Sequence, residues 1–142
     1  MLKNIIIRDY KPSDYDQIIE LWKQIDLGGA HRGDNKIIIE QSIAMGGKML
    51  IASTIEGMVV GTSWMTFDGR RIHLHHLGVK TDFQRKGIGK RLTEHSIRFA
   101  RDKGFQIKLE VHHDNIPAIN LYKKLGFNYL GDYDVYIIRS FD

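Results

Sequence analysis

The sequence predicts an α/β (α+β) fold in which a central mixed, mostly antiparallel sheet is flanked by helices. Three observations predict it. β-rich runs in the middle of the chain are joined by two tight-turn signals, Glu56-Gly57 and Asp68-Gly69. Two later segments have apolar residues at helical spacing, and Gly104 and Gly126 close them. The β-rich run Ile107–Val111 lies between these two helices, so a helix connects two strands there.

The first part of the chain is expected to contribute one strand and two helices. Ile5–Arg8 is a β-branched run typical of a strand. Ser13 or Asp14 is a suitable N-cap for the first helix. Its apolar residues recur at helical spacing: Ile18, Leu21, Trp22 and Ile25. Leu27–Asp34 is predicted to be a loop, and we expect Asp34 to cap a second helix that runs through Met45.

The rest of the chain alternates strands with helices. The predicted strands are Met49–Ile55, Met58–Phe67, Arg71–Val79, Ile107–Val111, Phe127–Leu130 and Val135–Arg139. The predicted helices are Gly87–Lys103 and a segment that begins at Pro117, a natural first-turn residue. In this last helix four residues are expected to face inward: Ala118, Leu121, Tyr122 and Leu125.

Length and composition bound the class of protein. The chain has 142 residues, of which 42% are hydrophobic and 27% charged, and shows no repeat or linker, so we expect residues 1–142 to form one domain. Cysteine is absent, which excludes disulfides, zinc-thiolate sites and a cysteine nucleophile. No signal peptide is evident, and no apolar run approaches the roughly 20 residues of a membrane helix. We therefore expect a cytoplasmic location and no membrane partner.

Positive charge is concentrated in one segment. The formal net charge of the chain is +4, and Lys80–Lys103 alone holds eight basic and three acidic residues. An anionic ligand is the simplest partner for such a segment. Nucleic acid is one such partner, but the interleaving of aromatic and basic residues typical of a single-strand binder is missing, so we expect no nucleic-acid partner.

The strongest local motif follows a predicted strand and opens a predicted helix. It consists of Gln84, Arg85, Lys86, Gly87, Ile88, Gly89 and Lys90. Its two glycines allow a tight turn and close approach of the backbone to a ligand, while the helix N-terminus and the three cations favour a pyrophosphate. A Walker A string is absent, and Leu92 stands where a dinucleotide fingerprint needs its third glycine.

This Gln-x-x-Gly-x-Gly motif resembles the acetyl-coenzyme A loop of the GNAT superfamily N-acetyltransferases. A second stretch, Asn115–Phe127, resembles that family's Asn-x-x-Ala-x-x-Leu-Tyr signature, and Leu77-Gly78-Val79 resembles the strand before its loop. The two signatures occur in the expected order and context, and the resemblance extends over nearly the whole chain. It implies a GNAT fold and direct transfer of the acetyl group from acetyl-CoA to a primary amine in a ternary complex, without an acyl-enzyme.

The resemblance also implies roles for individual residues. The backbone of Leu77, Gly78 and Val79 would bind the pantetheine arm, with the Leu77 N–H stabilising the oxyanion. The backbone of residues 84–90 would hold the pyrophosphate. Asn115 would contact the pantetheine end, and the Tyr122 phenol would lie near the coenzyme sulfur as general acid. A purely structural role stays open for both residues: Asn115 could be a simple helix cap, and Tyr122 could be an aromatic residue of the core.

The general base is expected among the histidines of the predicted strand Arg71–Val79. Period-two alternation places His73, His75, Leu77 and Val79 on one face and His76 on the other, where His76 would be structural. The His73/His75 pair is similar to the arrangement in arylalkylamine N-acetyltransferases, where the pair relays the proton through water. Histidine as a residue type suits this role because its ordinary pKa is close to neutral pH. Either histidine could instead be a polar residue satisfied by its neighbours. No third ligand accompanies the pair, so we expect no metal site, and His31, His95, His112 and His113 show no convergent pattern.

The acceptor and the assembly stay open at this stage. The acceptor pocket is expected to involve Leu27–Asp34, Trp64 and Tyr133–Tyr136, with a small-molecule amine slightly favoured over a peptide. A homodimer is neither indicated nor excluded. The alternative function is a non-catalytic acyl-CoA-binding regulatory module of the same fold, and turnover on an amine would separate it from the enzyme.

Overall fold

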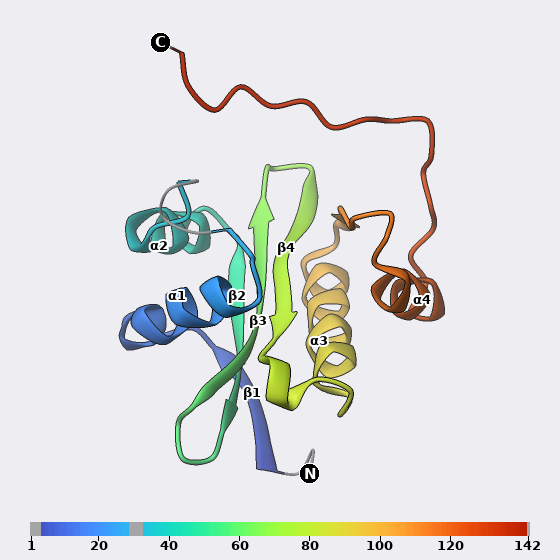
Figure 1. Ribbon diagram of the computed structural model, residues 1–142. Helices are drawn as coiled ribbons and strands as arrows, with labels where there is room; N and C mark the ends of the chain where they lie inside the picture. Colours follow the sequence, from blue (N-terminus) through green and yellow to red (C-terminus); the bar gives the residue numbers. More distant parts are fainter. Residues whose placement is uncertain (1–3, 29–32, 142) are drawn as a thin grey trace. The chain divides into compact units, whose positions relative to one another are not determined.

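The computed structural model describes residues 4–28 and 33–141 of the chain. It divides into two compact units, one ending at Glu110 and one beginning at Val111, and each is described by itself. The first unit holds a five-stranded sheet with helices on both faces (Figure 1).

The sheet is mixed, as the sequence predicts. Its strands are β1 (Ile5–Asp9), β2 (Lys48–Thr54), β3 (Val59–Phe67), β4 (Arg71–Val79) and β5 (Gln106–Leu109). They lie side by side in chain order, every neighbouring pair being antiparallel except β4 and β5. The parallel pair is made by the crossover helix between these two strands, which confirms the expected mostly antiparallel arrangement.

Helices and short 3-10 turns connect β1 to β2 and β4 to β5 in the first unit. They are the 3-10 turns η2 (Pro12–Asp14) and η4 (Thr81–Phe83) and the helices α1 (Tyr15–Gln24), α2 (Lys36–Ala44) and α3 (Ile88–Lys103). The expected cap at Asp34 is wrong by one residue, because the Asn35 side chain accepts the hydrogen bond from the Ile38 N–H at 2.9 Å. Asp34 instead lies 3.0 Å from His76 Nε2 through its Oδ2.

Buried polar contacts show which helix covers which face of the sheet. Trp22 of α1 donates its indole N–H to Thr62 Oγ1 of β3 at 3.0 Å. On the opposite face, Ser63 of β3 and Ser96 of α3 share a buried hydrogen bond of 2.7 Å. The core under α1 and α2 consists of Ile18, Leu21, Trp22, Ile39, Met49, Ile51, Val59 and Trp64. Burying side chains of this size contributes about 1.5–3 kcal/mol each, so α1 is fixed against the sheet chiefly by its apolar face.

A β-bulge interrupts the β3–β4 ladder and changes which side chains share a face. Trp64 pairs with His75 and Thr62 pairs with Gly78, so β4 uses one residue more than β3 over the same interval. His76, with φ of +44°, is the residue with left-handed backbone in this interval. Side chains beyond the extra residue point to the opposite face from the one that simple alternation predicts. Gly78, and not Val79, therefore lies on the same face of the sheet as His75.

The expectation that His76 faces away from His75 is therefore wrong. The His76 ring lies 4.4 Å from that of Trp22 and 5.2 Å from that of Trp64, centroid to centroid. Trp64 is the direct cross-strand partner of His75, so both histidines lie on the α1 face of the sheet. A single inserted residue leaves no periodic signal in a sequence, which is why alternation failed at this point.

The second unit contains α4 (Ile116–Lys124) and the segment that follows it. Pro117 lies in the first turn, as expected, and the Tyr122 and Phe127 rings meet edge to face at 5.7 Å. The strands expected at Phe127–Leu130 and Val135–Arg139 are wrong, since the described residues after Gly126 form neither helix nor strand. β-prone side chains make a strand only where a neighbouring backbone completes a ladder, and none does so here.

Candidate functional site

The site begins where β4 parts from β5. The parallel pairing runs only from Arg71 with Gln106 to Leu74 with Leu109, although β4 continues to Val79. Among the described residues, no strand pairs with the last five residues of β4 on the side away from β3. The backbone there is an edge to which an extended ligand can add as a further strand.

The glycine motif follows this edge directly. After η4 the chain passes through two left-handed residues, Arg85 at φ of +63° and Gly87 at φ of +84°, before α3 begins at Ile88. Ile88 is fully buried and anchors the helix start, so the turn before it is held in place. The first turn of α3 contains no acidic residue, and its leading N–H groups have no partner within the helix. This end of α3 is therefore suited to an anion.

Cations surround the helix start. Arg85 and Lys90 are exposed, and the Lys86 ammonium lies 5.5 Å from the centre of the Phe83 ring. Gln84 turns back and donates its side-chain N–H to the Val79 carbonyl at 2.9 Å, which ties the loop to the end of β4. A Cβ at Gly89 would meet only Val79, at an ordinary 3.9 Å, so the protein itself does not require glycine at this position.

His73 and His75 lie beside one another on β4, with ring centroids 6.1 Å apart and nearly parallel. His73 Nε2 lies 3.1 Å from Asp68 Oδ2, in the β3–β4 turn. His75 Nε2 lies 2.9 Å from Thr66 Oγ1 of β3. The structure thus gives each of the two predicted bases a separate polar partner. In the sequence, Asp68 is recognisable only as a turn residue.

The two histidines have different electrostatic surroundings. Desolvation, together with the nearby His76 and His73, lowers the pKa of His75 to about 4, although part of the residue stays open to solvent. The Asp68 carboxylate is held by the Arg71 N–H, the His73 side chain and the Arg70 N–H, which keep its pKa well below the usual range. His75 is therefore neutral at neutral pH, while His73 has a fixed negative charge beside it.

His76 and Asp34 form a second imidazole–carboxylate pair, at 3.0 Å and largely buried. A Cβ at Gly28 would clash with His76, so the chain before Asp34 passes close to this pair. Of the expected acceptor segment Leu27–Asp34, residues 29–32 lie outside the described part of the structure, as does His31. Trp64, expected near the acceptor, is almost fully buried and stacks on Trp22 at 5.9 Å, as part of the core under α1 and α2.

Asn115 and Tyr122 both belong to the α4 region of the second unit. Asn115 Oδ1 accepts the Ala118 N–H at 3.4 Å, which makes Asn115 the N-cap of α4. Burial raises the pKa of the Tyr122 phenol, so it keeps its proton at neutral pH. Tyr133 and Tyr136, expected near the acceptor, are exposed in a segment without regular structure.

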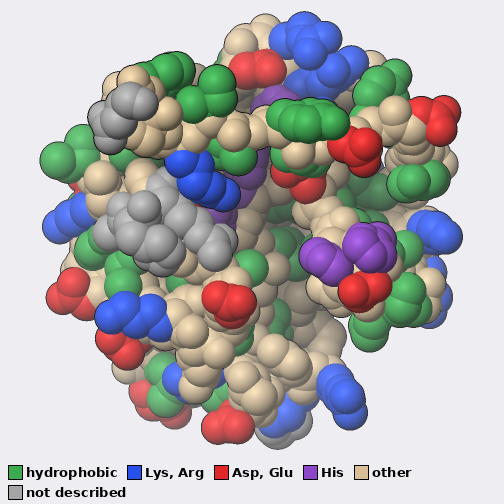
Figure 2. Space-filling view, turned by 45° about the horizontal axis from the view of Figure 1, so that its top comes forward, with side chains coloured by type: hydrophobic (Ala, Val, Ile, Leu, Met, Phe, Trp, Pro, Cys, Tyr) green, Lys and Arg blue, Asp and Glu red, His purple; other side chains and the backbone are tan. Residues whose placement is uncertain are grey.

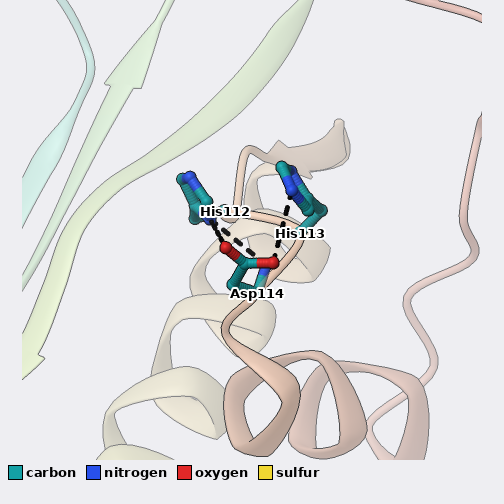
Figure 3. A group of neighbouring side chains, drawn as sticks. All are labelled: His112, His113 and Asp114. Carbon is teal, nitrogen blue, oxygen red and sulfur yellow. Dashed lines mark hydrogen bonds and ion pairs between the residues drawn. The ribbon is translucent and has the colours of Figure 1, made fainter.

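A group that the sequence analysis missed precedes α4. His112, His113 and Asp114 converge in one turn, with His113 Nε2 3.3 Å and His112 Nδ1 3.7 Å from the two Asp114 oxygens (Figure 3). Their adjacent positions in the sequence were the available signal. The donor set is one that divalent metals use, but all three side chains are exposed and the carboxylate already engages both imidazoles. The group remains a solvated surface feature.

Comparison with known proteins identifies the family. A sequence model of the acetyltransferase (GNAT) family matches residues 4–127. No helix in the described ranges is long and apolar enough to cross a membrane.

Three solved structures illustrate the likeness of fold. A GNAT-family acetyltransferase from Staphylococcus aureus Mu50 has a TM-score of 0.78 at 22% identity, over 87% of this chain and 83% of that one. AAC(6')-Iy, bound to the bisubstrate analogue CoA-S-monomethyl-acetylneamine, has a TM-score of 0.76 at 18% identity, over 96% and 99%. The ribosomal-protein-S18-alanine N-acetyltransferase of Escherichia coli has a TM-score of 0.74 at 22% identity, over 87% and 77%. The family match and this shared fold agree with the open β4 edge and its glycine loop: the chain belongs to the GNAT acetyltransferase family.

Proposed function

We propose that the protein is an acyl-CoA-dependent N-acetyltransferase that moves the acetyl group of acetyl-CoA directly to a primary amine in a ternary complex. The observation that carries this proposal is the continuity of two features in one stretch of chain. In the described part of the chain, the β4 edge at Leu77–Val79 has no strand on the side away from β3, and residues 80–87 connect it to the cation-flanked start of α3. An extended arm that ends in a pyrophosphate, as in coenzyme A, matches both features in that order.

The expected contacts with the coenzyme follow from the backbone. Leu77, Gly78 and Val79 would hydrogen-bond the pantetheine arm as an added strand. The backbone of Gln84–Lys90 would hold the pyrophosphate, with the charges of Arg85, Lys86 and Lys90 around it. The packing of the protein leaves room for a larger residue than glycine at position 89. A ligand that approaches the backbone closely at this point would explain why the residue is glycine. Crystals of AAC(6')-Iy with CoA support an acyl-CoA ligand in this fold.

The chemistry needs one proton acceptor and one proton donor. The amine that receives the acetyl group has a pKa of about 10, so it must lose a proton before it attacks the thioester. The proposed acceptors of that proton are His73 and His75. The Leu77 N–H would stabilise the negative oxygen of the tetrahedral intermediate. As the C–S bond breaks, Tyr122 would return a proton to the thiolate, consistent with a phenol kept protonated by its raised pKa.

Direct transfer agrees with the nucleophiles that the chain offers. With no cysteine in the sequence, the usual thiol carrier of an acyl group is missing. A protein that consumes acetyl-CoA works where that coenzyme is present, in keeping with the expected cytoplasmic location. The face in Figure 2 shows basic and acidic side chains interspersed rather than a continuous basic stripe, which gives no support to a nucleic-acid surface there.

Release of free CoA from acetyl-CoA tests the proposal, measured against a panel of amines. The proteins of similar fold include an aminoglycoside N-acetyltransferase and a ribosomal-protein-S18-alanine N-acetyltransferase. The panel should therefore hold an aminoglycoside and an Ala-starting peptide besides polyamines and amino acids. Turnover on at least one amine class is expected. Tight CoA binding without turnover on any amine would favour the regulatory module instead.

A further inference from the structure

Asp68 is fixed by the turn that it initiates. Its Oδ1 accepts the backbone N–H groups of Arg70 and Arg71, each at 2.7 Å. These two bonds set the plane of the carboxylate, and they leave the other oxygen, Oδ2, directed to His73 Nε2 at 3.1 Å. The β3–β4 turn thus positions a carboxylate oxygen against one nitrogen of one histidine.

This contact determines where the proton of neutral His73 resides. An ionised carboxylate has only acceptor sites, so the shared hydrogen belongs to the imidazole and is carried on Nε2. A neutral imidazole carries one hydrogen, which leaves the Nδ1 lone pair free to take a proton. The other candidate, His75, pairs with a hydroxyl at Thr66, which can donate or accept and so does not select a tautomer.

We propose that Asp68 is the positioning residue of the proposed reaction, holding His73 as the Nε2–H tautomer so that His73 Nδ1 accepts the proton of the attacking amine. The inference rests on the proposed function. In the step, the amine nitrogen forms the bond to the acetyl carbon while its proton passes to Nδ1, and the C–S electron pair leaves with sulfur. The resulting imidazolium lies beside the Asp68 carboxylate, which stabilises the new charge.

Other charged groups around His73 make the carboxylate more important. Lys108 is the cross-strand neighbour of His73 on β5, and Arg70 and Arg71 belong to the same turn as Asp68. The Arg71 guanidinium is directed to Gln106 Oε1 at 2.9 Å. These cations oppose a positive charge on His73, and the Asp68 carboxylate offsets them.

Asp68→Asn separates this role from the structural one. The amide oxygen of asparagine can still accept the Arg70 and Arg71 N–H groups, while its NH₂ group cannot accept from His73. We expect kcat/KM to fall about tenfold, less than the roughly 10²–10⁴-fold that a proton-transferring group itself contributes, because His73 is still present. The affinity for CoA and the Tm should not change. Asp102→Asn, an exposed change at the far end of α3, is the matched control and should leave activity unaltered.

A double-mutant cycle decides whether Asp68 acts through His73. In a His73→Ala background, Asp68→Asn should cause no further loss, whereas an equal tenfold loss there would overturn the proposal. A readout independent of turnover is the two-bond ¹H–¹⁵N correlation spectrum of the histidine rings. The wild type should show His73 as the Nε2–H tautomer and Asp68→Asn a mixture, while an Nδ1–H tautomer in the wild type would also overturn it. Failure of every amine in the turnover assay would refute the proposed function alone.

Discussion

Thr62 faces Gly78 across the β3–β4 ladder, one residue out of step with the pairing of Trp64 and His75. The extra residue of β4 turns Gly78, instead of a larger side chain, toward α1. A Cβ on Gly78 would lie 2.5 Å from Ile25 Cδ1 and 2.7 Å from Leu27 Cδ1. The bulge thus lets the chain after α1 approach the part of β4 that is proposed to bind the coenzyme.

Gly78→Ala tests this close approach. The added methyl group must displace the ends of Ile25 and Leu27, and overpacking of this kind costs about 1–3 kcal/mol. Urea denaturation should show a lower midpoint with an unchanged slope. A variant as stable as the wild type would mean that α1 and the chain after it do not pack against the bulge as described.

Gly89→Ala should leave the stability of the fold intact and weaken the binding of CoA. A Cβ fits there without a clash, and alanine in a helix is favoured over glycine by about 0.5–1 kcal/mol, so stability should be kept or raised. The methyl group would, however, stand where the pyrophosphate is proposed to approach the backbone. We expect the Kd for CoA, measured by calorimetry, to rise about tenfold, equivalent to about 1.4 kcal/mol.

Normal CoA binding in a stable Gly89→Ala protein would remove the reason proposed for this glycine. Gly78→Ala is its natural counterpart, since one substitution is expected to affect mainly folding and the other mainly the ligand.

Tyr122→Phe should slow turnover without stopping it. A thiol has an ordinary pKa of about 8.5, so the coenzyme leaves tolerably as the thiolate, and loss of the proton donor is expected to cost about tenfold in kcat. CoA affinity should not change, because the ring and its contact with Phe127 are retained. Full activity in this variant would assign Tyr122 to packing alone.

Asp14 is expected to make the fold sensitive to acid. It is buried, and burial by itself would raise its pKa, but two 2.8 Å bonds from Arg8 and one from the Lys11 N–H outweigh that effect and lower it. Because the folded pKa lies below the unfolded value of about 3.9, the pair stabilises the fold fully above that value and progressively less as the pH falls below it.

Asp14→Asn should therefore lower the unfolding free energy at pH 7 by about 2 kcal/mol and flatten its decline below pH 4. Chemical denaturation across pH 3–7 measures both. If the unfolding free energy of Asp14→Asn declined below pH 4 as steeply as that of the wild type, other carboxylates would control acid unfolding.

The sequence predicted the elements that periodicity and turn residues specify. The predicted bounds of β4 are those of the structure, and Gly104 ends α3 as expected. The cap was misplaced by one residue because Asp34 and Asn35 are both good capping residues, and only tertiary contact with His76 separates them. The bulge at His76 has no periodic signature.

The candidate site was predicted as a set of positions and not as a geometry. The glycine motif indicated an anion site because its chemistry is local to the loop. The link between Asp68 and His73 depends on the fold of the turn, which brings a side chain back onto the strand that follows it. The two strands expected after Gly126 were wrong because residue preference cannot supply a neighbouring strand.

Calorimetric titration of the wild-type protein with CoA tests the central claim most directly. The account predicts saturable binding of one CoA per chain with a Kd on the order of 10 μM, weakened by Gly89→Ala and unaffected by Asp68→Asn. No binding at millimolar CoA would contradict it, since the open edge of β4 and the glycine loop would then have no ligand of the proposed kind.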